Sequence, residues 1–189
     1  MRRDEFEHVI AAAAEVSGER EIVVIGSQAI LGSVPNPPKT MLFSMEADVY
    51  PLHAPEKAEE IDGSLGDGSS FHGMNGYYAH GVGPETAVAP AGWQKRLVRV
   101  DIPPRAGQAA GPVALCLEVH DLVLAKCVAG RERDWEFARD AVAADLVQVE
   151  ELLRRVNDLP EPPADRGHVR KMLEGIASRV LGRDDDNCS

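Results

Sequence analysis

The hydrophobic periodicity of the chain changes near residue 118, and this change is the strongest constraint on the fold. Before it, short apolar or alternating runs typical of strands are separated by runs with helical spacing. After it, apolar residues recur only at helical spacing, over about 121–130, 132–143, 146–157 and 164–181. This order predicts an α+β fold, with a mixed β-sheet flanked by helices and followed by a helical C-terminal half.

The length of the chain limits the number of domains. With 189 residues it can form one domain, or a domain with a small helical appendage. We expect an α+β core over 1–118 and a helical subdomain over 119–182. The last residues, 183–189, are acidic and polar, and we expect a disordered tail there.

Individual elements of the core are visible in the sequence. Residues 4–17 have helical spacing of apolar side chains, and EIVVIGSQAILG is typical of a strand, a tight turn and a helix. Further strands are predicted over 45–50, 77–82, 96–102 and 112–119, with a helix over 55–62. The stretch around the 77–82 strand is rich in Gly and Ser, so we expect mobile loop on either side of it.

Composition and charge restrict the location and partners of the protein. No apolar run is long enough to cross a bilayer, and the N-terminus, MRRDEFEH, becomes acidic where a signal peptide would become apolar. We therefore expect a cytoplasmic protein with no membrane partner. A formal net charge of −11 disfavours general adhesion to nucleic-acid backbones, although a local basic pocket could still hold a nucleic-acid end.

Cysteine and histidine give no metal pattern. Cys116, Cys127 and Cys188 are odd in number and widely spaced, which we interpret as two core residues and one loose thiol. The six histidines are scattered, and the closest pair, His72 and His80, lies in the Gly-rich stretch. We do not expect the histidines to bind metal.

The segment SMEADVYP carries two acids inside a strand-like run. Alternation places Glu46 and Asp48 on one surface, with Ala47 and Val49 on the other. Two adjacent carboxylates raise each other's pKa unless a cation lies between them. Hard oxygen ligands suit Mg²⁺, whose coordination is completed by phosphates and water, so we predict an Mg²⁺ site here. The alternative is the solvent-facing side of an edge strand.

A nucleotide bound to such a metal needs a second phosphate contact. Gly26 and Ser27 form a strand-to-helix turn, where small residues let backbone N–H groups approach an anion at a helix N-terminus. Taken alone, the same pair better suits an ordinary helix entry with Ser27 as the N-cap, and the sequence context favours the phosphate contact.

These motifs together resemble a known superfamily. VVIGSQAIL followed by SMEADV resembles the signature of the polymerase-beta-like nucleotidyltransferases, in which a Gly-Ser or Gly-Gly turn precedes two acids one residue apart. HDLVLAKCVAGRERDWEF is similar to the helical half of its toxin-like branch, of the AbiEii and mycobacterial MenT type. The resemblance covers about residues 20–145 and implies an enzyme that transfers NMP from an NTP to an acceptor.

The resemblance implies a role for each matching residue. Gly26 and Ser27 would contact the nucleotide phosphates, Glu46 and Asp48 would hold Mg²⁺, and Lys126 would neutralise charge on the triphosphate. The alternative for Lys126 is a surface lysine on a helix whose other face is core.

A third acid would orient the attacking hydroxyl. We assign this catalytic role to Asp101, on the polar face of a later strand, with Asp134 as the alternative. Asp101 could instead pair with Arg99. Asp121 is interpreted as a helix N-cap and is left out of the site.

The acceptor is not written in the sequence. Members of the superfamily that the chain resembles modify tRNA 3′ ends, proteins or small antibiotics. The resemblance to the toxin-like branch therefore implies a tRNA or protein acceptor and an antitoxin partner. Two departures favour a second hypothesis, a noncatalytic nucleotide- or partner-binding module: the first acid is Glu46 where Asp is more usual, and Leu42 stands where a basic residue often precedes the acids. A third hypothesis, a small-molecule nucleotidyltransferase, would need an enclosed acceptor pocket.

Overall fold

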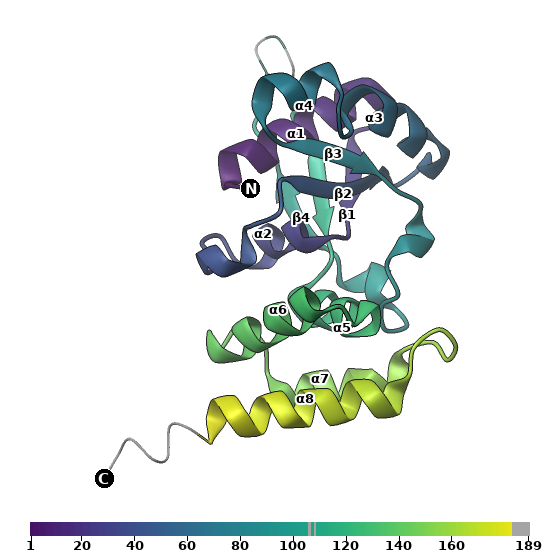
Figure 1. The fold of residues 1–189 in the computed structure, drawn as a ribbon. Helices are drawn as coiled ribbons and strands as arrows, with labels where there is room; N and C mark the ends of the chain where they lie inside the picture. The colour runs from purple at the N-terminus through teal and green to yellow at the C-terminus, as the bar shows by residue number, and fades with distance from the viewer. Residues whose placement is uncertain (106, 108, 183–189) are drawn as a thin grey trace. The chain divides into compact units, whose positions relative to one another are not determined.

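The computed structural model describes residues 1–105, 107 and 109–182, which form two compact units (Figure 1). The first unit comprises Met1–Ala87 and Arg96–Glu118, and the second comprises Val88–Lys95 and the chain from Val119 onward. The tail expected over 183–189, including Cys188, lies outside the described residues.

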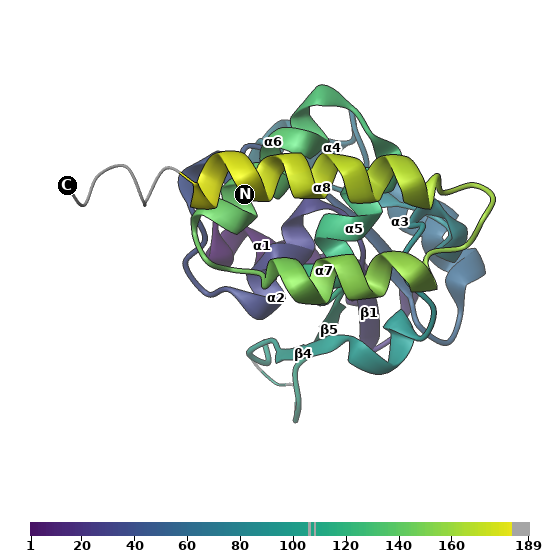
Figure 2. The same cartoon turned by 90° about the horizontal axis from the view of Figure 1, so that it is seen from below.

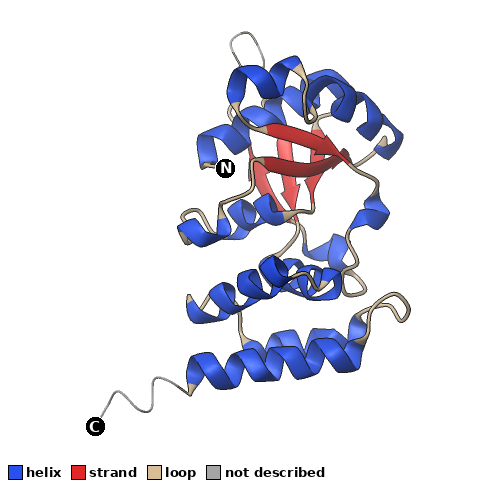
Figure 3. Ribbon diagram, in the orientation of Figure 1, coloured by secondary structure: helices blue, strands red, loops and turns tan. Residues whose placement is uncertain are grey.

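A five-stranded mixed sheet forms the centre of the first unit (Figure 3). The strand order is β3-β2-β1-β5-β4, so β3 and β4 lie at the two edges. The β1/β5 and β2/β3 pairs are parallel, whereas β1/β2 and β4/β5 are antiparallel. The strands are β1 Glu21–Val24, β2 Glu46–Pro51, β3 Tyr78–Gly81, β4 Val98–Asp101 and β5 Val113–Cys116. The predicted mixed sheet and its strands are confirmed.

Four α-helices accompany the sheet in the described part of the first unit: α1 Arg3–Ser17, α2 Ile30–Ser33, α3 Ala58–Leu65 and α4 Ser70–Asn75. In Figure 1, α1, α3 and α4 lie on one side of the sheet. The 3₁₀-helices are η1 Ser27–Ala29, η2 Lys39–Met41, η3 Pro55–Lys57, η4 Pro84–Thr86 and, at the boundary of the two units, η5 Trp93–Arg96.

Helix α1 forms because its apolar residues lie on one face. Phe6, Val9, Ile10 and Ala13 are completely buried, as their spacing predicts. Gly18 ends the helix in the left-handed conformation, with φ of 69°, which a residue without a Cβ adopts at little cost.

Helix α4 was not predicted, because the Gly- and Ser-rich composition around it indicated a loop. Its ends are fixed by local caps instead. The Ser69 hydroxyl accepts a hydrogen bond from the His72 N–H at 3.1 Å, and Gly76 closes the helix at φ 75°. Capping therefore outweighs composition in this segment.

The short segment that follows β1 also packs on the sheet. Helix α2 packs so closely on β5 that a Cβ added to Gly32 would lie 2.3 Å from the Cβ of Cys116. Cys116 and Cys127 are both buried, as predicted for core residues. Burial raises the pKa of each thiol to about 12.

The described part of the second unit is helical, as the periodicity predicts. Its helices are α5 Val119–Ala129, α6 Glu132–Ala143, α7 Val149–Arg155 with η6 Val156–Asp158, and α8 Arg166–Leu181. Helices α7 and α8 lie side by side (Figure 2). Val88–Lys95 joins this unit, with the Ala91 N–H donating to the Asp158 carbonyl at 2.8 Å.

The interpretation of Asp121 as an N-cap is wrong. Helix α5 begins two residues earlier, at Val119, which places Asp121 inside the first turn. Its side chain is fully buried, and the Arg155 guanidinium donates to its carboxylate at 2.9 Å. Asp121 therefore ties α5 to α7 through a buried ion pair.

In the part of the chain that the structure describes, no helix combines the length and the apolar composition needed to cross a lipid bilayer.

Candidate active site

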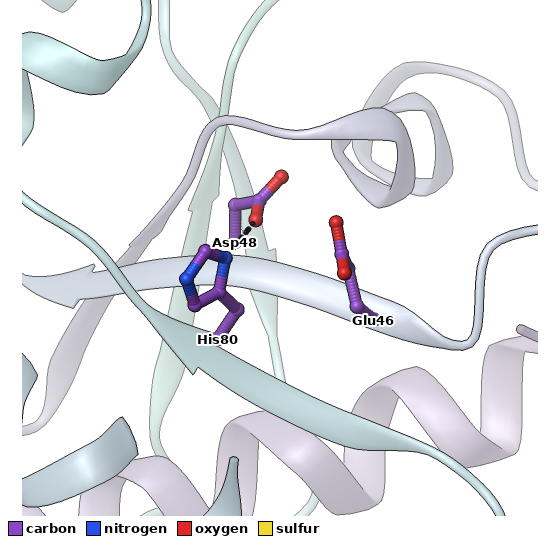
Figure 4. A group of neighbouring side chains, drawn as sticks. All are labelled: Glu46, Asp48 and His80. Carbon is purple, nitrogen blue, oxygen red and sulfur yellow. Dashed lines mark hydrogen bonds and ion pairs between the residues drawn. The ribbon is translucent and has the colours of Figure 1, made fainter. Parts of the chain in front are cut away.

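The two acids of β2 lie beside a histidine of the neighbouring strand. Glu46 and Asp48 project from the face opposite to Ala47 and Val49, which are completely buried. The parallel pairing of β2 with β3 places His80 opposite Asp48. One ligand atom from each of Glu46, Asp48 and His80 lies within 4.8 Å of the other two (Figure 4).

Asp48 contacts a different partner through each carboxylate oxygen. Its Oδ1 lies 3.0 Å from Nδ1 of His80, shown by the dashed line in Figure 4. Its Oδ2 faces Gly26 so closely that an added Cβ at Gly26 would lie 1.8 Å from it. Only glycine leaves room for the carboxylate here. The turn after β1 and the second acid of β2 are thus brought together.

The backbone fixes this contact between the turn and the strand. The Ile25 N–H donates to the Asp48 carbonyl at 3.1 Å, and Gln28, fully buried, donates through Nε2 to the Ser44 carbonyl at 3.0 Å. The N-cap of η1 is Gly26, and Ser27 is the first residue inside the helix. The interpretation of Ser27 as an N-cap is therefore wrong.

Glu46 is held by a tyrosine. The Tyr78 hydroxyl donates to Oε2 of Glu46 at 2.7 Å. This hydrogen bond, together with burial and nearby negative charge, raises the pKa of Tyr78 to about 12. A glutamate is longer than an aspartate by one methylene, and Tyr78 compensates by fixing where its carboxylate lies.

The structure does not bring Asp101 to this site. Two strands, β1 and β5, separate β4 from β2. Asp101 is aligned with Val113 and, through it, with Glu21 at the start of β1, whereas Asp48 lies beside the end of β1. Strand spacing and rise put Asp101 roughly 20 Å from Asp48.

The surroundings of Asp101 explain its polar position. Its side chain is exposed and forms an ion pair with Arg99 at 2.8 Å, which was the alternative reading. Alternation along β4 puts Asp101 on the exposed face, as predicted, but the strand order that decides the neighbours of β4 is not contained in that alternation.

Lys126 and Asp134 belong to the second unit and bind each other. Nζ of Lys126 lies 3.2 Å from Oδ1 of Asp134, and Nε of Arg131 donates to Oδ2 at 2.8 Å. Burial opposes ionisation of Asp134, but its hydrogen bonds and charge interactions with Arg131 and Lys126 outweigh burial, so the pKa of Asp134 is lowered. A carboxylate held in this way is a weak base. The assignment of Lys126 to the nucleotide stays a prediction.

A comparison with protein-family models gives a match over most of the chain. A family model described as a nucleotidyltransferase of unknown function (DUF6036) matches residues 4–172. The chain belongs to this family. Membership in this nucleotidyltransferase family supports nucleotidyl transfer as the general reaction class, whereas the AbiEii/MenT-type branch stays a prediction. No curated protein and no solved structure matches the chain.

Two residues of the candidate site, Tyr78 and His80, are not among the residues predicted from the sequence. The strand over 77–82 was predicted, and its alternation puts both side chains on one face. What was not visible is that this strand pairs with β2, 32 residues away in the sequence. Two carboxylates and one imidazole at these distances fit a divalent cation, so His80 joins the candidate ligands.

Proposed function

We propose that the protein is a metal-dependent nucleotidyltransferase that transfers NMP from an NTP to an acceptor. The observation that carries the proposal is the convergence of Glu46, Asp48 and His80 beside the Gly26 turn, in a chain of a nucleotidyltransferase family. An acceptor oxygen attacks the α-phosphorus, a new P–O bond forms, and the bond from the α-phosphorus to pyrophosphate breaks.

In this proposal, different residues of the first unit bind the metal, contact the phosphates and orient the Glu46 carboxylate. Glu46 and Asp48 would hold a divalent cation, and their carboxylate oxygens taken alone would suit Mg²⁺. When bound, the cation stabilises negative charge on the triphosphate and lowers the pKa of the acceptor hydroxyl. Gly26 and Ser27 offer backbone N–H groups to the phosphates, and Tyr78 keeps the Glu46 carboxylate in place.

The third catalytic group of the proposal differs from the sequence prediction. Asp101 is distant from Asp48, and Asp134 is buried against two cations. His80 takes the place beside Asp48 in which a third acid was expected. Lys126 is retained as a triphosphate contact on the strength of the resemblance, in addition to its pairing with Asp134.

The acceptor in this proposal is a tRNA end or a protein, and the biological role is that of a toxin with an antitoxin partner. The resemblance to the toxin-like branch supports both assignments. The net charge of −11 favours an acceptor presented as an end over a long duplex. The noncatalytic alternative is favoured by one observation, the absence of Asp101 from the site, and it requires NTP binding without transfer.

The test uses the full chain, each α-labelled NTP, a divalent cation and a total cell extract. We expect pyrophosphate release and label in one fraction, both lost in Asp48→Asn. Glu59→Gln, which changes an exposed acid on α3, is the matched control and keeps full activity. Saturable NTP binding with no labelled fraction for any NTP would reject transfer in favour of the binding module.

A further inference from the structure

We propose that His80 makes the Glu46–Asp48–His80 site select a first-row transition ion over Mg²⁺, and Mn²⁺, whose ligand preferences are nearest to those of Mg²⁺, is the probe ion. This inference rests on the proposed function for the location of the metal, and it names the cofactor class that the site takes. The observation behind it is that Nδ1 of His80 lies 3.0 Å from a carboxylate oxygen of Asp48, with Glu46 in the same group.

The donor atoms decide the preference. Mg²⁺ favours oxygen ligands and binds nitrogen poorly, whereas imidazole is an ordinary ligand of first-row transition ions. A site with two carboxylates alone gives Mg²⁺ no disadvantage. One nitrogen donor added to the two carboxylates therefore favours the first-row transition ions. Mn²⁺ resembles Mg²⁺ in suiting carboxylate and water ligands, so a gain in Mn²⁺ affinity from His80 isolates the effect of the nitrogen.

The distances agree with ligation by neighbouring groups. Adjacent ligands of an octahedral ion bound at about 2.1 Å lie about 3.0 Å apart. The separation between Nδ1 of His80 and Oδ1 of Asp48 is 3.0 Å, and the ligand atoms of all three residues lie within 4.8 Å of one another. A cation can therefore replace the hydrogen bond between His80 and Asp48 with only side-chain adjustment, because the β2/β3 ladder fixes both backbones.

The exposure of the ligands leaves room for substrate. The His80 side chain is 49% exposed and that of Asp48 is 22% exposed. One side of the group is therefore accessible to water and phosphate oxygens, which would complete the coordination. Tyr78 donates to Glu46 from the same strand as His80, so β3 supplies both a ligand and the residue that orients another ligand.

A histidine beside an acid can also be a simple surface pair, and the chain offers a control of that kind. Nε2 of His53 lies 2.9 Å from Oε2 of Glu21 in the same unit, with the imidazole 68% exposed. Among the described residues this pair belongs to no group of three ligands. His53→Ala thus removes a comparable pair without touching the proposed site.

The experiment measures metal binding in the absence of nucleotide. The full chain is titrated with Mn²⁺, free Mn²⁺ is followed by EPR, and Mg²⁺ is added as competitor. We expect Mn²⁺ to bind about tenfold or more tightly than Mg²⁺. His80→Ala should weaken Mn²⁺ binding about tenfold and Mg²⁺ binding much less. His80→Asp should lower the ratio of Mn²⁺ to Mg²⁺ affinity, because it gives the site oxygen ligands alone.

Pulsed EPR on bound Mn²⁺ distinguishes a ligand from a neighbour. We expect a directly bonded nitrogen coupling that is retained in His53→Ala and lost in His80→Ala and His80→Asp, with thermal unfolding confirming that each variant is folded. Absence of the coupling, absence of saturable Mn²⁺ binding, or an Mn²⁺/Mg²⁺ ratio unchanged by both His80 variants would overturn the inference.

These outcomes are separable from those of the transfer assay. Nitrogen-ligated Mn²⁺ without nucleotidyl transfer from any NTP would support the inference and reject the proposed function. Transfer supported by Mg²⁺, with an Mn²⁺/Mg²⁺ affinity ratio independent of His80, would support the proposed function and reject the inference.

Discussion

At the scale of single residues, Tyr78 is the support on which the position of Glu46 depends. Tyr78→Phe removes the 2.7 Å hydrogen bond to Glu46 but keeps the ring, whose centroid lies 4.7 Å from that of His72. Because orienting partners of metal ligands contribute strongly to affinity, we expect Mn²⁺ affinity to fall about tenfold with little change in melting temperature. Metal titration and thermal unfolding measure the two effects.

The adjacent tyrosine gives a matched control for this change. The Tyr77 hydroxyl pairs with Nδ1 of His8 at 2.8 Å and contacts none of the three candidate ligands through a described hydrogen bond. Tyr77→Phe should leave Mn²⁺ affinity as it is. Equal losses in the two variants would mean that the Glu46 carboxylate is positioned by something other than Tyr78.

Gly26 is the residue whose replacement should damage the site through space alone. In Gly26→Ala the new Cβ would lie 1.8 Å from Oδ2 of Asp48, so the carboxylate must move away from His80. We expect Mn²⁺ affinity to fall at least about tenfold and the free energy of unfolding to fall by about 1–3 kcal/mol. Metal titration and denaturant unfolding test this.

Gly63 provides the contrast for that substitution. It lies within α3, and an added Cβ there meets nothing within 4 Å. Gly63→Ala should raise the free energy of unfolding by about 0.5–1 kcal/mol and leave metal affinity unchanged. A Gly26→Ala variant that binds Mn²⁺ as well as Gly63→Ala does would show that Asp48 has another position from which to bind.

At the scale of elements, α7 is joined to α5 through ion pairs of Arg155. Arg155 of α7 donates both to the buried Asp121 of α5 and to Glu151 one turn earlier. Hydrogen bonds from Arg154 and Arg155 lower the pKa of Glu151 from 4.5 to about 2. The folded state therefore stabilises the ionised form of the Glu151 carboxylate more than the unfolded state does.

This pKa shift has a defined consequence for acid stability. Because the pKa of Glu151 is lowered on folding, its contribution is complete above pH 4.5 and is lost as the pH falls toward 2. The difference in unfolding free energy between wild type and Glu151→Gln should therefore be largest near pH 6 and shrink through pH 4 and 3. Denaturant unfolding at each pH measures it, with the exposed neighbour Glu150→Gln as control. A difference independent of pH would contradict the argument.

The same scale shows which elements can be predicted from sequence. Helix α1 and strand β2 are defined by side chains a few residues apart, so their periodicity is visible directly. Helix α4 depends on the Ser69 cap in a stretch whose composition indicates a loop. The sequence predicts the start of α5 two residues too late because Asp121 resembles a cap, whereas the partner of Asp121, Arg155, is 34 residues away.

At the scale of the whole molecule, the candidate site shows where sequence reasoning ends. The pairing of Glu46 with Asp48 is local, and it was predicted from alternation alone. The inclusion of His80 and the exclusion of Asp101 both depend on strand order, with β3 next to β2 and β4 at the opposite edge. Neither follows from the pattern within a single strand, because strand order is decided by how the helices and strands of the first unit pack together.

The parallel alignment of β2 with β3 also makes the geometry of the candidate site sensitive to sheet register. Asp48 is aligned with His80 and Glu46 with Tyr78, so both partners reach the acids through one alignment. A slip of a single residue at this edge would turn the imidazole and the phenol together toward the helical layer and present Ala79 in their place. The segment between the two strands can thus change in length or composition during evolution, provided that β3 still pairs with β2 in the same register.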